Sequence, residues 1–302
     1  MNYKSILNLI GILLAIFSCA FVPPLIVTFI YDEPLSEIFL YSFLFLISLG
    51  GLMWFISRQK GLPLNISDGF IITTMFWVVL ACAGSIPFYF FGLSLNDAIF
   101  ESVSGITTTG ATLIVGLDDL PKSLLLYRQL LQWIGGMGLI ILAVAVMPAL
   151  GIGGSQLYKM ELPGSHGNQK LTPKITDSAK ALWKIYFGLT LACALLYILS
   201  GMDLFDAIAH SLSTVAGGGF STHDKSIGFF DSGLIEAVCI IFMLLSAASF
   251  AVHYAAIFGG KPLRYFYDSE FRFFLTVVMS IILITLIFHT ISNSCLLYTS
   301  DA

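Results

Sequence analysis

The sequence has very little charge. Only 11% of its 302 residues are Asp, Glu, Lys or Arg, whereas about 25% is usual for soluble domains. The 14 basic and 18 acidic residues give a net charge of −4 and form no basic patch, so nucleic acid is not an expected partner. The five cysteines include no CxxC pair, and we interpret the four that precede the C-terminal tail, which lie in apolar runs, as inert packing residues.

Apolar residues take the place of the missing charge. They make up 57% of the chain, and the mean hydropathy is +0.91. A helix needs about 20 apolar residues to cross a bilayer. The first run is too long for a signal-peptide core and lacks a cleavage site, so we expect it to be retained. Seven runs are long enough to span: 5–31, 36–57, 68–91, 124–149, 178–200, 234–258 and 270–292. The sequence therefore predicts an all-α protein of the lipid bilayer.

The basic residues predict its orientation. If each run spans once, three basic residues lie on one side, namely Lys122, Arg128 and Lys225, and eleven lie on the other. Cytoplasmic loops are the ones enriched in Lys and Arg. The N-terminus and the segments 58–67, 150–177 and 259–269 are therefore expected in the cytoplasm.

Two intervals on the outer side, 92–123 and 201–233, are too long and too apolar for plain loops. At an offset of 109 residues, GLSLNDAIFESVSGITTTG (92–110) aligns with GMDLFDAIAHSLSTVAGGG (201–219). Eight of these nineteen positions are identical, and a spanning run precedes and follows each copy. This pattern indicates an internal duplication.

Each copy predicts a short helix followed by a polar return strand. Asn96, Asp97 and Asp206 are candidate N-caps. A helix of about ten residues from there covers roughly 15 Å, half of a bilayer core of ~30 Å, so it can only enter and return. The return strands are 107–112, TTTGAT, and 216–221, AGGGFS.

An uncharged polar segment at membrane depth needs a compensating partner, because an unpaired buried polar group costs about 1–3 kcal/mol. A cation without its water favours a ring of carbonyl oxygens, and glycine lets consecutive carbonyls face one axis. The short helix also directs the negative end of its dipole toward such an ion. A filter of this kind needs four quarters. Two are present and the seventh run would open a third repeat, so we expect four repeats in the natural polypeptide.

Three stretches closely resemble one known family. They are RQLLQWIGGMGLIILAVAVMPALGIGGSQLYKMELPG (128–164), KLTPKI (170–175) and STHDKSIGFF (221–230). They are similar to the TrkH/TrkG branch of the Trk/Ktr/HKT potassium transporters, and the resemblance covers nearly all of residues 1–293. It implies a potassium-selective pore without enzymatic activity in the bacterial inner membrane. It also implies a homodimer gated by cytosolic nucleotide-binding regulatory subunits, with potassium as the transported ion and no further cofactor.

The resemblance also assigns residues. By the motif, Thr108, Thr109 and Gly110 form the first quarter of the selectivity filter, and 217–219 (Gly217, Gly218 and Gly219) form the second. Potassium would bind at Thr108, Thr109, Gly217 and Gly218. The family's gating loop and a pore-facing arginine would lie beyond residue 302.

The same comparison divides the chain. The division is 1–67, a two-helix extension; 68–149, the first pore-loop repeat; 150–177, a cytoplasmic linker; 178–260, the second repeat; 261–293, the start of a third; and 294–302, a tail. The last eight residues, CLLYTSDA, resemble the translation of a transposase sequencing adapter, so we expect the tail to be non-native and the third repeat to be truncated.

The residues also bear on two other functions. An intramembrane hydrolase using Ser102 or Ser104 is excluded, because only the second copy has a nearby histidine, His210. A sodium- or proton-coupled transporter with broken helices stays open, although a direct duplication favours a ring of pore loops. Glu101 and His210 are equivalent in the two short helices and are interpreted as braces rather than proton relays.

The segment 132–138, QWIGGMG, has two interpretations. It can form a kinked helix that lines the pore, or a helix–helix contact built on small residues. The sequence favours neither over the other, and the two are compatible.

Overall fold

The computed structural model describes residues 3–58, 66–150, 175–257, 259–260 and 263–300, and every regular element in these ranges is a helix. The elements are α1 (Tyr3–Ser18), η1 (Cys19–Phe21), α2 (Val22–Ile30), α3 (Ser36–Ser57), α4 (Ile66–Gly84), α5 (Ile86–Phe91), α6 (Leu95–Ile106), η2 (Leu117–Asp119), α7 (Lys122–Leu150), α9 (Ile175–Leu199), α10 (Leu204–Ala216), η4 (Ser226–Phe230), α11 (Gly233–Ser246), α12 (Phe250–Ile257), α13 (Arg264–Tyr267) and α14 (Ser269–Ser300). The predicted all-α class is confirmed.

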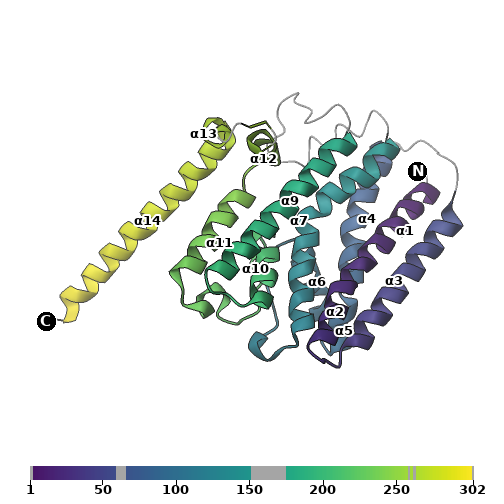
Figure 1. Cartoon of the computed structure of the whole chain (residues 1–302), viewed down its shortest axis with the longest axis horizontal. Helices are drawn as coiled ribbons and strands as arrows, with labels where there is room; N and C mark the ends of the chain where they lie inside the picture. The colour runs from purple at the N-terminus through teal and green to yellow at the C-terminus, as the bar shows by residue number, and fades with distance from the viewer. Residues whose placement is uncertain (1–2, 59–65, 151–174, 258, 261–262, 301–302) are drawn as a thin grey trace.

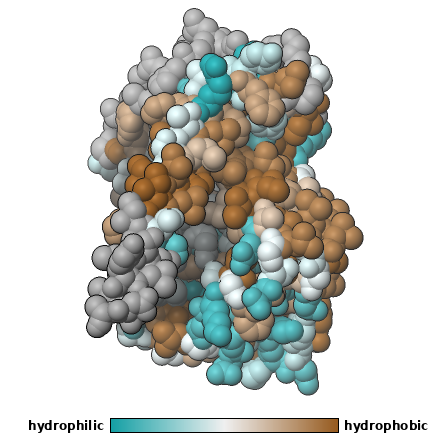
Figure 2. Space-filling model, turned by 90° about the vertical axis from the view of Figure 1, so that its left-hand side faces the viewer, coloured by the Kyte–Doolittle hydropathy of each residue, from teal (hydrophilic) through white to brown (hydrophobic). Residues whose placement is uncertain are grey.

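Five helical stretches within the described residues are long and apolar enough to cross a membrane: Tyr3–Ile30, Ser36–Ser57, Asp68–Phe91, Lys180–Leu199 and Ser269–Thr290. They correspond to five of the seven predicted runs. The run 124–149 lies within α7, a single helix of 29 residues. Figure 2 shows a band of hydrophobic side chains across the middle of one face and hydrophilic ones gathered below it, as a bilayer-spanning molecule requires.

The run 234–258 is divided between two helices, a break that the sequence did not predict. Helix α11 ends at Ser246 and α12 begins at Phe250. The carbonyl of Leu245 accepts a hydrogen bond from the N–H of Ala248 (3.0 Å) and lies 2.9 Å from Nε2 of His253. The imidazole therefore takes a carbonyl that a continuing α-helix would have bonded to its own backbone.

The first two spans pack closely through small residues. A Cβ on Gly11 of α1 would lie 2.8 Å from the carbonyl oxygen of Gly50 on α3, and a Cβ on Gly50 would lie 2.6 Å from that of Gly11. Glycine at both positions thus brings the two backbones into contact, which is how helices associate in lipid. Glu33, in the turn between α2 and α3, joins this pair to the next helices by accepting hydrogen bonds from the N–H groups of Lys122 and Ser123 at the start of α7.

The two short helices are α6, of 12 residues, and α10, of 13 residues. At 1.5 Å per residue they measure about 18–20 Å and cannot cross a bilayer core of ~30 Å. We call them the half-helices. Figure 1 shows both among the long helices, in the half of the molecule opposite the N-terminus.

Their predicted N-caps were misplaced. The caps are Ser94, whose hydroxyl accepts from the N–H of Asp97, and Asp203, whose carboxylate accepts from the N–H of Phe205. Both half-helices begin earlier than Asn96, Asp97 and Asp206 would allow. Asp97 instead accepts a hydrogen bond of 2.7 Å from the Ser94 hydroxyl, so its carboxylate fixes the side chain that caps the helix.

Candidate functional site

The two return strands, 107–112 and 216–221, meet where the half-helices end. A Cβ on Gly110 would lie 2.0 Å from the carbonyl oxygen of Gly218, so the two copies touch through backbone alone. Gly218 is buried, Thr108 and Gly110 are half-buried, and Thr109, Gly217 and Gly219 are exposed. The structure therefore brings the two predicted groups of filter residues together at one place.

Both strands leave their half-helix in the same way. The N–H groups of Thr108 and Thr109 donate back to the carbonyls of Gly105 (3.0 Å) and Ser104 (2.9 Å). The second copy repeats both bonds at the offset of 109, from Gly217 to Thr214 (3.1 Å) and from Gly218 to Ser213 (3.0 Å). In a trans peptide the carbonyl of the preceding residue points opposite to the N–H. The carbonyls of residues 107, 108, 216 and 217 are therefore directed away from the half-helices.

The backbone hand alternates in both strands. Residues Thr108 and Gly110 have φ of +56° and +79°, and their equivalents Gly217 and Gly219 have φ of +67° and +80°. Thr109 and Gly218, which lie between them, do not have positive φ. A change in the sign of φ from one residue to the next turns successive carbonyls toward the same side. A threonine is held at positive φ only where its surroundings enforce it.

A residue of each half-helix fastens the return strand of its own copy. Oε1 of Glu101 accepts a hydrogen bond of 2.6 Å from the hydroxyl of Thr112 and another of 2.6 Å from the N–H of Leu113. At the equivalent positions, Nε2 of His210 lies 2.9 Å from the hydroxyl oxygen of Ser221. Glu101 and His210 are almost fully buried. These contacts confirm that both residues brace the site.

Helix α7 supplies the wall behind the strands. Oε1 of Gln132 accepts a hydrogen bond of 3.1 Å from the N–H of Phe220, and its amide fills the space that a Cβ on Gly218 would need. A Cβ on Gly135 would lie 1.9 Å from the carbonyl oxygen of Ile106, the last residue of α6.

The next residue of α7 makes the corresponding contact with the second copy. A Cβ on Gly136 would lie 3.3 Å from Cα of Ala216, the last residue of α10. Two consecutive glycines thus admit the ends of both half-helices. The interpretation of 132–138 as a close contact of small residues is confirmed.

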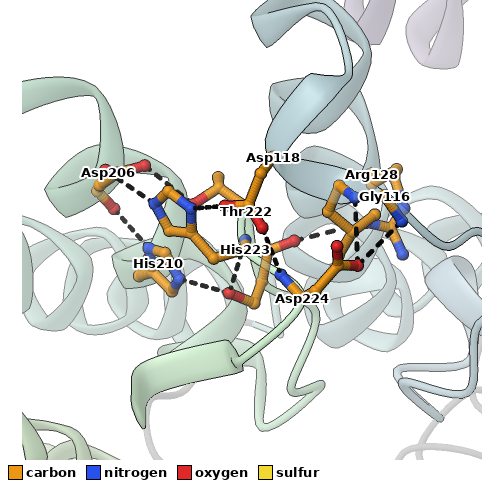
Figure 3. A network of polar contacts seen from close by, with 10 residues as sticks. Gly116, Asp118, Arg128, Asp206, His210, Thr222, His223 and Asp224 are labelled. Carbon is orange, nitrogen blue, oxygen red and sulfur yellow. Dashed lines mark hydrogen bonds and ion pairs between the residues drawn. The ribbon is translucent and has the colours of Figure 1, made fainter. Parts of the chain in front are cut away.

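A polar network joins the outer loops of the two copies (Figure 3). Asp224 accepts hydrogen bonds of 3.1 Å from the N–H groups of Gly116 and Leu117. The ring of His223 lies between two carboxylates, with Nδ1 2.5 Å from Asp118 and Nε2 3.3 Å from Asp206. We call these contacts the outer clamp.

The outer clamp has an electrostatic signature. The hydrogen bond from His223 holds the pKa of Asp118 below its ordinary value. The sequence predicted only an N-cap role for Asp206 and did not predict the clamp. The signal that could have found the clamp is the run Thr222–Asp224, THD, which follows the second return strand directly.

A cavity of about 260 Å³ opens beside the second return strand. It is lined by residues of α10, the return strand, η4 and α11: His210, Ser213, Thr214, Gly217, Gly218, Gly219, Phe220, Ser226, Ile227, Cys239 and Met243. The three glycines of the predicted second quarter therefore line a cavity. Within the described residues no group of three or more His, Cys, Asp or Glu side chains is placed to hold a metal ion.

Comparison with known proteins gives consistent matches. The family TrkH, described as cation transport protein, matches residues 35–297. The Trk system potassium uptake protein TrkH of Vibrio parahaemolyticus is 48% identical over 289 residues, covering 94% of this chain and 60% of the relative. TrkH of Escherichia coli K12 is 44% identical over 308 residues, covering all of this chain and 64% of the relative.

The structural comparison agrees. The crystal structure of the potassium transporter TrkH from Vibrio parahaemolyticus superposes with a TM-score of 0.81 at 46% identity, covering 94% of this chain and 58% of that one. The chain thus spans about 60% of the length of the relatives that it matches.

Proposed function

The chain belongs to the TrkH family of cation transport proteins, and from this membership and the geometry of the return strands we propose that it contributes to potassium uptake across the bacterial inner membrane. The ion would pass through a filter of backbone carbonyls and not through an enzymatic cycle. The observation that carries the proposal is the repeated backbone turn, in which the same N–H groups bond back to the half-helix in both copies. Carbonyls released in this way are the ligands that a dehydrated potassium ion requires.

We assign the first quarter of the filter to Thr108, Thr109 and Gly110, and the second quarter to Gly217–Gly219. Potassium would bind the carbonyls of Thr108, Thr109, Gly217 and Gly218. The half-helices are then pore helices, and each copy has the order helix, pore helix, filter strand, helix. The negative ends of both helix dipoles face the ion, which adds to the attraction of the carbonyls.

This chain spans about 60% of the length of its relatives. The remaining two quarters would come from the part of the relatives that this chain does not cover. We retain the proposed division of the chain into an extension, two repeats and the start of a third. By the family resemblance, we further propose a homodimer that is regulated by a cytosolic nucleotide-binding subunit.

We propose that the N-terminus is cytoplasmic. The support from the basic residues is stronger than the eleven-to-three count indicates, because Arg128 is buried in the bundle at 1% exposure. Only Lys122 and Lys225 then remain for the outer side, and Lys122 lies over the ring of Tyr31.

Rubidium uptake into proteoliposomes tests the function. We compare residues 1–290 alone with the same residues joined to the remaining repeats of the Vibrio parahaemolyticus TrkH. Two filter strands leave an ion half coordinated, so we expect uptake only in the joined protein, with rubidium preferred over sodium. Uptake by residues 1–290 alone would refute the requirement for four quarters. The sodium- or proton-coupled alternative would be favoured instead if uptake by the joined protein stopped when only the counter-ion gradient was removed.

A further inference from the structure

One buried ion pair lies directly behind the two return strands. Arg128 on α7 and Glu101 on α6 are 1% and 0% exposed, and Nε of the arginine lies 3.5 Å from Oε2 of the glutamate. It is the one arginine–carboxylate pair among the residues that the structure describes. Burial makes such a pair costly to form, because both charges lose their water. A mere packing role would be met more cheaply by apolar side chains.

The guanidinium reaches both copies. Nη2 donates a hydrogen bond of 2.9 Å to the hydroxyl of Thr112, in the first return strand. Nη1 donates to the carbonyl of Ser221 at 3.4 Å, in the second, and Cζ lies 4.4 Å from the centre of the Phe220 ring. Thr112 and Ser221 are equivalent residues of the repeat, two positions beyond the final filter glycines. The planar fork of an arginine can make such contacts at once, whereas a lysine cannot.

The second copy has no such pair of its own. At the offset of 109, Glu101 corresponds to His210 and Arg128 corresponds to Ala237. His210 holds the hydroxyl of Ser221 but makes no described contact with that residue's carbonyl. The carbonyl of the second strand therefore depends on the cation that belongs to the first copy.

We propose that Arg128 is a positioning residue for cation selectivity, which sets the placement of both filter strands from one buried charge. The inference rests on the proposed function. Because the two strands share this anchor, removing it moves both of them while the half-helices keep their own contacts with α7 at Gly135 and Gly136. Variants that lose this anchor should therefore still fold but discriminate less between potassium and sodium.

The test uses a variant that stays electrically neutral. Glu101→Gln with Arg128→Met removes both charges together, so no unpaired charge is left buried. Arg128→Lys keeps the charge and loses the fork. Lys225→Met is the matched control, because it removes an exposed cation from the same side without touching either strand.

The first measurement is the ratio of rubidium to sodium flux in the joined protein described above. We expect the double variant to insert and to conduct, with a ratio at least about tenfold below that of the unaltered protein. Arg128→Lys should give an intermediate ratio, and the control should give the unaltered one. An unchanged ratio in the double variant would show that the pair only stabilises the fold.

The second measurement does not depend on transport. Amide hydrogen exchange of residues 1–302 is followed in the segments 107–115 and 216–224. The double variant should accelerate exchange in both segments, whereas the Lys225→Met control should accelerate it in neither. If the second segment is unchanged in the double variant, Arg128 does not hold it and the inference is wrong. Failure of the unaltered protein to conduct would instead refute the proposed function.

Discussion

The two final filter glycines form a natural matched pair. Gly110 and Gly219 are equivalent in the repeat and have nearly the same φ, +79° and +80°. They differ in the space around them. A Cβ on Gly110 would lie 2.0 Å from the carbonyl oxygen of Gly218, whereas no described atom lies within 4 Å of a Cβ on Gly219.

Alanine at either position therefore has the same energetic cost of a positive φ. Only at Gly110 would its Cβ also collide with another part of the chain. Holding an alanine at positive φ costs about 1–2 kcal/mol. If the strand relieves this strain by turning its carbonyl off the pore axis, the preference for potassium falls roughly five- to thirty-fold in Gly219→Ala. In Gly110→Ala the backbone contact between the strands must also open. We expect a lower melting temperature and little measurable uptake in that variant.

The assay is the ratio of rubidium to sodium flux, with the melting temperature of each purified variant. Thr109→Ala is the reference, since it removes a hydroxyl that bonds only to Thr107 in the described structure and leaves the carbonyl in place. It should change the ratio less than Gly219→Ala does. Equal effects of the two glycine variants, or a larger effect of Thr109→Ala, would refute the assignment of selectivity to these carbonyls.

Three further predictions concern the scaffold and its orientation. Glu33→Gln should destabilise the fold by about 0.5–2 kcal/mol, because the carboxylate of Glu33 caps the start of α7, where it accepts a hydrogen bond of 2.6 Å from the N–H of Lys122. Thermal melting measures the effect, and Glu37→Gln, at an exposed position, is the control. The pKa of Asp118 is lowered in the folded protein, so its carboxylate stabilises the fold above the ordinary pKa of 3.8, and this stabilisation is lost as pH falls through the folded pKa. Asp118→Asn should therefore flatten the acid limb of a curve of stability against pH. A cysteine at Lys170, which lies outside the described residues, should resist an impermeant reagent in intact cells, and labelling there would overturn the topology.

Much of the site was predictable because each copy of the duplication is a short continuous segment, so that aligning the two copies shows which residues are equivalent. The offset of 109 predicted two half-helices and two return strands, and the equivalence of Glu101 and His210 predicted two braces. The caps were less predictable, since several side chains near a helix start can accept the same N–H groups. The misplacement of the caps at Asn96, Asp97 and Asp206 shows this limit.

What the sequence could not predict depends on contacts between distant segments. Arg128 was counted among the outer basic residues, but a buried glutamate 27 positions earlier draws it into the bundle. The break after Ser246 likewise depends on the ring of His253, which lies on the far side of the break. Hydropathy alone registers only the apolar character of that run.

The glycine pair of α7 has a consequence for the autonomy of the two copies. By sequence α7 belongs to the first copy, but the ends of both half-helices rest on its adjacent residues Gly135 and Gly136, which are only about 1.5 Å apart along the helix axis. Because α7 is a single helix, a movement of α7 at these residues moves the ends of α6 and α10 together. Tilting α7 would therefore move the ends of both half-helices, and with them both proposed filter quarters, together. A chain cut between the two copies would leave the end of α10 without the surface that it packs against. The two copies are therefore expected to fold and move as one unit and not as two independent ones.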